Sequence, residues 1–168
     1  TPLSIKKMKE LFEDVSEKDI AETVRELADE HARRNGGMYL AEVAGGFQFR
    51  TVEAAAPWIL KLRGGKPALL SQAAMETLAV VAYRQPVLKS EIEQVRGVDV
   101  SAALKGLLEK NLVRIVGRKD VAGRPIMYGT TKRFLEVFNL RDLSELPTLH
   151  EMRELEEAGE MEVLESLE

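Results

Sequence analysis

The sequence uses one pattern of apolar positions twice. When Pro2 is placed on Pro86, apolar residues of the first half fall on apolar residues of the second without a gap. The aligned pairs are Leu3 with Val87, Met8 with Ile92, Leu11 with Val95, Ile20 with Leu104 and Val24 with Leu108. Because a repeated core pattern indicates one supersecondary unit used twice, the chain is expected to form two similar domains.

Each half combines helical spacing with two short strand-like runs. Helices are predicted over 5–12, 17–34 and 52–62 in the first half, with strands over 39–43 and 47–51 around Gly45-Gly46. In the second half, helices are predicted over 71–85, 89–95 and 101–110, strands over 112–117 and 126–128, and a closing helix after Thr131. Two helices followed by a strand-loop-strand wing are typical of the winged helix. The predicted fold class is therefore mainly α with small β-hairpins (α+β), in two tandem winged-helix domains.

Changes in amino-acid composition along the chain indicate where the domains end. Gly64-Gly65-Lys66-Pro67 has no large apolar side chain to bury, so it predicts a linker. After Pro147 the chain becomes strongly acidic, which is typical of a solvated, mobile tail. We therefore predict a first domain over 1–63, a linker over 64–67, a second domain over 68–146 and an acidic tail over 147–168.

The two halves differ in one respect. A helix precedes Pro86 in the second half, whereas only Thr1 precedes Pro2 in the first. This difference predicts that the chain begins inside a longer natural protein, and that an apolar face of the first domain is exposed or covered by a partner.

Bulk properties favour a protein partner over chemistry. The net charge is −4, so a phosphate backbone is repelled except at a local basic patch, and the absence of cysteine excludes disulfides and thiolate sites. No apolar run reaches the ~20 residues of a membrane span, and the first residues do not resemble a signal peptide. A cytoplasmic location is expected.

Catalysis has little support in the sequence. The serines Ser4, Ser16 and Ser71 precede predicted helices, where capping explains them. His31 and His150 have no nucleophile or ligand at a recognisable spacing. We predict no catalytic residue, no metal site and no cofactor.

Several longer motifs resemble those of the segregation and condensation protein B family. The specific matches are ETLAVVAYRQP at 76–86, EIEQVRGV at 91–98, GRKD at 117–120, GRPIMYGTT at 123–131 and LRDLSELP at 140–147. The first half agrees more loosely, through PLS at 2–4 and EVAGGFQFRT at 42–51, so the resemblance covers nearly everything before the tail. Leu88 departs from the family, which more often has a threonine cap there.

The resemblance implies a non-enzymatic adaptor. In this family the first domains join a homodimer, and the second domains hold the kleisin subunit that bridges the structural-maintenance-of-chromosomes ATPase. It also implies a role in chromosome condensation, chromosome partition and cell division, a place beside the nucleoid, and only indirect or weak contact with DNA. A DNA-binding transcriptional regulator is the alternative, because winged helices commonly place a helix in the major groove.

The charge distribution argues against the DNA-binding alternative. The helix expected to read bases carries many acids in the first domain, and in the second it offers only Lys105 and Lys110 beside Glu109. The basic residues of the second wing are instead spread around a Gly-Arg-Pro turn: Arg114, Arg118, Lys119, Arg124, Lys132 and Arg133. An ordinary turn or a weak phosphate contact both fit this wing.

Two groups of residues are candidates for interfaces. Tyr83, Arg84 and Gln85 end a predicted core helix, and together with Arg118, Lys119 and Arg124 they are the predicted partner-binding set. The aromatics of the first domain, which either pack in its core or form the dimer interface, are Phe47, Phe49 and Trp58.

Overall fold

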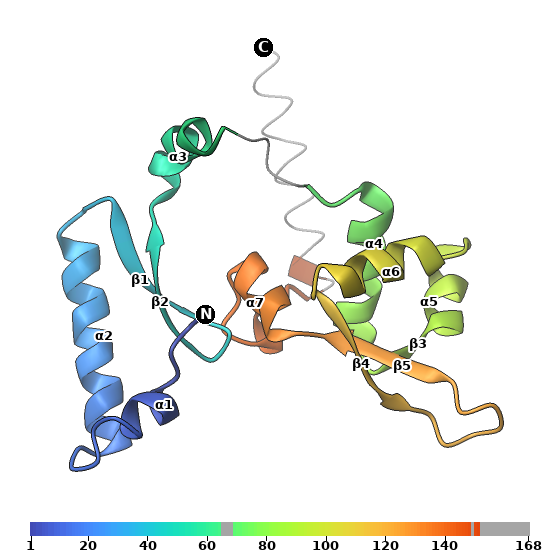
Figure 1. Ribbon diagram of the computed structural model, residues 1–168, viewed down its shortest axis with the longest axis horizontal. Coiled ribbons are helices and arrows are strands. Elements are labelled where there is room, and N and C mark those ends of the chain that lie inside the picture. The colour runs from blue at the N-terminus through green and yellow to red at the C-terminus, as the bar shows by residue number, and fades with distance from the viewer. Residues whose placement is uncertain (65–68, 149, 152–168) are drawn as a thin grey trace.

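The computed structural model describes residues 1–64, 69–148 and 150–151, and has a mixed α/β fold. Figure 1 shows two lobes, blue to teal and green to orange, which meet near the middle of the molecule. The first lobe consists of α1 (Ile5–Lys9), α2 (Glu17–Arg33), β1 (Met38–Val43), β2 (Gly46–Thr51), the 3-10 turn η1 (Glu53–Ala55) and α3 (Ala56–Arg63). The predicted tail lies almost wholly outside the described residues, as does most of the predicted linker.

Hydroxyl caps define the first two helices, as predicted. Ser4 Oγ accepts from the Lys7 amide, and Ser16 Oγ accepts from the Asp19 amide. The first helix ends at Lys9 rather than at residue 12, and the side chain of Leu11 is 72% exposed. The prediction over 5–12 was too long, because a turn of helix without a packed apolar face gains little from propagation.

The first hairpin turns one residue earlier than predicted. Its two central residues are Ala44 and Gly45, with φ of 51° and 72°, as a tight hairpin turn requires. Gly46 instead begins β2, where a Cβ would lie only 2.8 Å from the carbonyl carbon of Leu3. This close approach allows the amides and carbonyls of Leu3 and Phe47 to bond to each other, both at 2.9 Å.

The closing helix of the first half does not pack as predicted. Trp58, Ile59 and Leu62 were expected in the core, but Trp58 is 70% exposed, Leu62 is 88% exposed and Ile59 is only half-buried. Figure 1 shows α3 beyond the end of the hairpin and away from α2. The described chain leaves most of the surface of Trp58 and Leu62 uncovered, and helical periodicity alone could not show this.

The second lobe contains α4 (Gln72–Arg84), β3 (Val87–Leu88), α5 (Lys89–Arg96), α6 (Ser101–Glu109), β4 (Val113–Arg118), β5 (Ile126–Thr130), α7 (Lys132–Phe138) and the 3-10 turn η2 (Leu143–Glu145). Its antiparallel sheet has the order β3-β5-β4. The core is a single cluster of buried side chains: Leu78, Val81, Ala82, Val87, Ile92, Val100, Leu104, Leu107, Leu112, Val113 and Phe134. The predicted helix starts at Ser71 and Thr131 are confirmed by their cap hydrogen bonds.

Among the residues that the structure describes, three hydrogen bonds join the two lobes. The turn amides of Ala44 and Gly45 donate to the carbonyls of Leu140 and Arg141 at 2.9 and 3.0 Å. The guanidinium of Arg50 donates to the carbonyl of Glu136 at 2.6 Å. The first hairpin is therefore held by α7 and by the segment that follows it.

The turn before α6 is organised by a carboxylate. Asp99 accepts from the amide of Ser101 at 3.0 Å and from its hydroxyl at 2.9 Å, and Lys89 Nζ lies 3.3 Å away. The Ser101 hydrogen bonds, followed by Lys89, lower the pKa of Asp99 from 3.8 to about 2. The ionised form of this side chain is thus favoured by the fold.

We expect Leu107→Ala to lower the free energy of unfolding by about 2–5 kcal/mol, because it removes a fully buried side chain from the core of the second lobe. Chemical denaturation measures the change. Leu69→Ala, at an 83% exposed position before α4, is the matched control and is expected to change stability by less than about 0.5 kcal/mol. Equal effects would contradict the described core.

The contribution of Asp99 to stability depends on pH. Its pKa is lower in the folded chain, so its stabilising effect is present above the ordinary value of 3.8 and is lost as pH falls toward about 2. The difference in unfolding free energy between the native chain and Asp99→Asn should be constant above about pH 5 and shrink below about pH 4. Denaturant titrations at several pH values measure it, and a difference that grows on acidification would contradict the assignment.

Candidate partner-binding surface

A shallow apolar hollow lies where the end of α4 meets the sheet. It is lined by Gln85, Pro86, Val116, Met127 and Leu143 and has a volume of about 350 Å³. These residues come from the α4–β3 turn, from β4, from β5 and from η2, so four separate segments build it. The hollow is open to solvent and its lining is mostly apolar, which suits the side chain of a partner better than a small polar substrate.

Gln85 fixes the floor of the hollow. Its side-chain oxygen accepts from the amide of Thr130 at 2.8 Å and from its hydroxyl at 3.0 Å, while its Nε2 donates to the carbonyl of Ala82 at 3.1 Å. These bonds attach the end of α4 to β5, and Thr130 is buried. Gln85 was predicted as a partner contact, and the structure places it at the hollow while also giving it this structural role.

A β-bulge brings Val116 to the hollow. The register of β4 against β5 shifts between Ile115 and Gly117, so Val116 has no partner residue in the ladder. Its Cγ1 lies against Gly129, where an added Cβ would be only 2.8 Å away. The sequence analysis did not find Val116, Met127 or Leu143, because neither the bulge nor the return of η2 to the sheet leaves a periodic signal.

Tyr83 and Arg84 lie beside this hollow at the end of α4. The Tyr83 hydroxyl donates to the carbonyl of Pro147 at 2.7 Å, although the side chain is still 45% exposed. Arg84 is exposed. Both predicted residues are therefore at the surface, and Tyr83 also marks where the chain leaves the second lobe.

The predicted basic residues of the wing make different contacts. Arg118 donates to the carbonyl of Arg124 at 3.0 Å, which closes the wing turn, and the Lys119 ammonium lies 3.5 Å from the carboxylate of Glu91 on α5. The pKa of Glu91 is lowered, mainly by the hydrogen bond from the Leu88 amide and then by Lys119. Leu88 has no acceptor side chain of its own, so Glu91 alone caps the start of α5.

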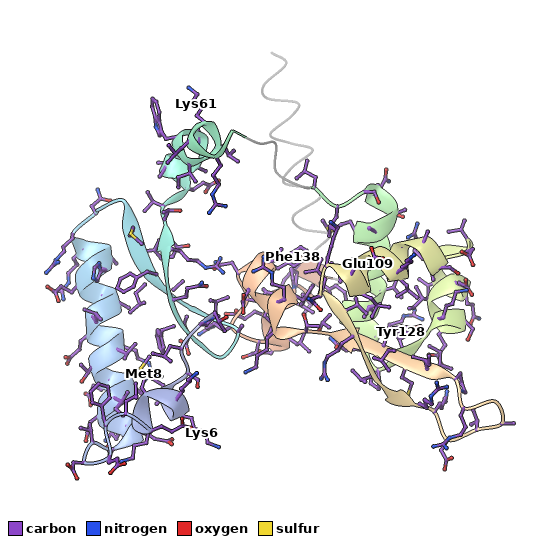
Figure 2. All side chains as sticks on the ribbon, viewed as in Figure 1. Lys6, Met8, Lys61, Glu109, Tyr128 and Phe138 are labelled. Atoms are coloured by element: carbon purple, nitrogen blue, oxygen red, sulfur yellow. The ribbon has the colours of Figure 1, made fainter. Side chains whose placement is uncertain are left out.

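The first-lobe aromatics divide into one core residue and two exposed ones. Phe47 is buried, as the core interpretation predicts. Phe49 is 46% exposed and meets the ring of His31 edge-on at 4.9 Å, and the Lys61 ammonium lies 5.0 Å from the exposed ring of Trp58. The core interpretation was wrong for Phe49 and Trp58, because the described elements cover each of these rings only in part. Figure 2 shows Lys61 on the outer helix of this lobe.

Ligand chemistry is sparse in the part of the chain that the structure describes. Those residues contain no group of three or more His, Cys, Asp or Glu side chains placed to hold a metal ion. Within the same residues, no helix is long and apolar enough to cross a membrane.

The fold and these surfaces define a class of protein: two small α/β units tied together at one hairpin turn, with open apolar surfaces flanked by charge. The family described as "Segregation and condensation complex subunit ScpB" matches residues 1–149. The chain belongs to this family, whose name places it in chromosome segregation and condensation.

Named relatives agree with this assignment. The chain is 47% identical over 150 residues to segregation and condensation protein B of Syntrophotalea carbinolica, covering 89% of this chain and 76% of that protein. It is 49% identical over 136 residues to the protein of the same name from Myxococcus xanthus, covering 81% of this chain and 41% of that protein. The chain thus spans less than half of the second relative's length.

A crystal structure of ScpB from Mycobacterium tuberculosis is 34% identical to the chain, covering 82% of this chain and 86% of that one, with a TM-score of 0.42.

Gln85→Ala tests the structural link at the floor of the hollow. The substitution leaves the Thr130 amide and hydroxyl without their acceptor, so we expect a loss of about 1–3 kcal/mol in unfolding free energy. Gln94→Ala, at an exposed position on α5, is the control and should be nearly neutral. Thermal and chemical denaturation measure both, and equal stability of the two variants would contradict the link.

Proposed function

We propose that this chain is a non-enzymatic adaptor built from two tandem winged-helix domains, over 1–63 and 68–146. The proposal is supported by the same strand order in both halves. In the first half, Leu3 pairs with β2, and β2 pairs with β1. In the second half, β3 pairs with β5, and β5 pairs with β4. In each half, two helices lie between the first of these strands and the hairpin, and a helix closes the unit.

The adaptor binds the kleisin subunit of the bacterial condensin-like complex through its second domain. The observation that carries this assignment is the apolar hollow, set beside Tyr83 and Arg84 on a member of the condensation-complex family. Tyrosine and arginine beside an apolar hollow are the residue types that anchor protein interfaces. Arg118, Lys119 and Arg124 extend the surface along the wing.

Through the kleisin, the adaptor regulates the structural-maintenance-of-chromosomes ATPase, which performs the hydrolysis. The chain itself uses no cofactor and acts in the cytoplasm at the nucleoid, with any DNA contact indirect or weak. Support for a protein partner rather than DNA comes from α6, where Lys105 and the C-cap residue Lys110 lie on either side of Glu109 in sequence.

Dimerisation uses the first domain. Support comes from the exposed apolar side chains of β2 and α3, where Phe49, Trp58 and Leu62 are all at the surface of a lobe with few buried residues. Exposed aromatic and large apolar side chains on the surface of a small lobe are typical of protein interfaces.

Isothermal titration with the central segment of the kleisin from the same organism tests the binding proposal. We expect binding that survives a rise from low to moderate salt, because an apolar interface depends less on ionic strength than phosphate contacts do. Arg84→Glu is expected to weaken it by about tenfold or more, which is about 1.4 kcal/mol.

Lys105→Glu, at a 79% exposed position on α6, is the charge-matched control and should bind like the native chain. No binding to the kleisin segment, together with salt-sensitive retention of duplex DNA, would contradict the adaptor and favour a DNA-binding regulator.

Trp58 reports on dimerisation because it is the single tryptophan of the chain. In a dimer formed through this face, its fluorescence maximum should move to longer wavelength on dilution, as the ring becomes exposed to water. Trp58→Asp should sediment as a monomer of 18.8 kDa at concentrations where the native chain has twice that mass. The same red-shifted maximum at every concentration would contradict an interface at Trp58.

A further inference from the structure

The charge of the chain is distributed unevenly along its length. Residues 151–168 contain eight glutamates and one arginine, a net charge of −7. The whole chain has −4, so residues 1–150 carry +3; residues 1–68 contain eleven basic and eleven acidic side chains and are neutral. The excess positive charge therefore belongs entirely to the second half, which also holds the apolar hollow.

Two arginines are close in sequence to lining residues of the hollow. Arg84 immediately precedes Gln85, and Arg114 lies two residues before Val116 on β4, where it is paired with Gly129. The nearby carboxylate of Glu145 is already paired with Arg141, and that of Glu91 with Lys119. An apolar hollow with two arginines close to its lining residues in sequence is complementary to a segment that combines apolar side chains with negative charge.

Pro147, near the end of the described chain, lies next to Tyr83. The Tyr83 hydroxyl holds the carbonyl of Pro147 at 2.7 Å, two residues from Gln85, and Leu143 of the lining lies just upstream. Beyond Pro147 there are 21 more residues, and at ~3.3 Å per extended residue they reach well past a hollow that begins next to Tyr83. The glutamates in this stretch alternate with the apolar side chains Met152, Leu155, Met161, Leu164 and Leu167.

We propose that the acidic segment 151–168 docks on the hollow of its own chain, with an apolar side chain in the hollow and glutamates facing Arg84 and Arg114. The segment then covers the surface formed by Gln85, Val116 and Met127. Docking within one chain is favoured because the short connection from Pro147 gives the segment a high effective concentration at the hollow.

Paramagnetic labelling of the full chain tests this proposal. The chain has no cysteine, so Leu164→Cys provides a single site for a nitroxide. The methyl signals of the methionines are then compared with the nitroxide oxidised and reduced. We expect loss of the Met127 signal in the oxidised state and its return on reduction, while Met8, in the first lobe (Figure 2), keeps its intensity.

Two controls separate charge from simple proximity. Raising the salt concentration from ~0.1 M to ~1 M shortens the screening length from ~10 Å to ~3 Å and should restore the Met127 signal. Arg84→Glu should restore it as well, whereas Lys105→Glu on α6 should not, and an unchanged Met75 shift verifies that the α4 fold is retained.

Three outcomes would overturn the proposal. Equal attenuation of Met127 and Met75 would mean that the segment samples the surface without docking. Full intensity at Met127 would place the segment elsewhere. In a third experiment, isotope-labelled native chain is mixed with spin-labelled chain that carries no isotope label. Attenuation of Met127 in this mixture would assign the contact to a second copy. None of these measurements uses the kleisin, so their outcome is independent of the proposed function.

Discussion

Burial of one face of α4 is the constraint on which the second lobe depends. Leu78, Val81 and Ala82 are buried on that helix, and side chains from α5, α6, β3, β4 and α7 pack into the same cluster. Fully burying a Leu, Val or Ile side chain contributes about 1.5–3 kcal/mol, so this cluster dominates the stability of the lobe. Because α4 is fixed in this way, its C-cap residue Gln85 can reach Thr130 and set the floor of the hollow.

The first lobe depends on backbone contacts to a greater degree. Its buried apolar residues are few: Ile20, Ala41, Val43, Ala44 and Phe47. The turn at Ala44 and Gly45 is held through main-chain amides by the segment after α7, and Arg50 adds one further bond to a carbonyl. Since these bonds use main-chain acceptors on the second lobe, they fix the hairpin without requiring particular side chains there. The apolar side chains of α3 are left free of the core, as a partner-binding face requires.

Charge and apolar surface are arranged together in the second lobe. The wing turn is closed by Arg118 on the carbonyl of Arg124, and Lys119 is paired with Glu91, so part of the basic charge has a structural use. Arg84 and Arg114 are close in sequence to the apolar lining residues of the hollow, and both the proposed kleisin contact and the proposed docking of the acidic segment use this combination of charge and apolar surface.

The sequence by itself determined the repeated unit, the helix starts at Ser4, Ser16, Ser71 and Thr131, the two hairpins and the family. These features depend on local capping, on periodicity and on long motifs, all of which can be identified from consecutive residues of the sequence. Tertiary structure alone decided that Trp58 and Leu62 are exposed, that Ala44 rather than Gly46 lies in the turn, and that Val116, Met127 and Leu143 share one hollow. The physical reason is that burial, close backbone approach and bulges depend on which distant segment packs against a residue, and a single sequence carries no periodic signal for that choice.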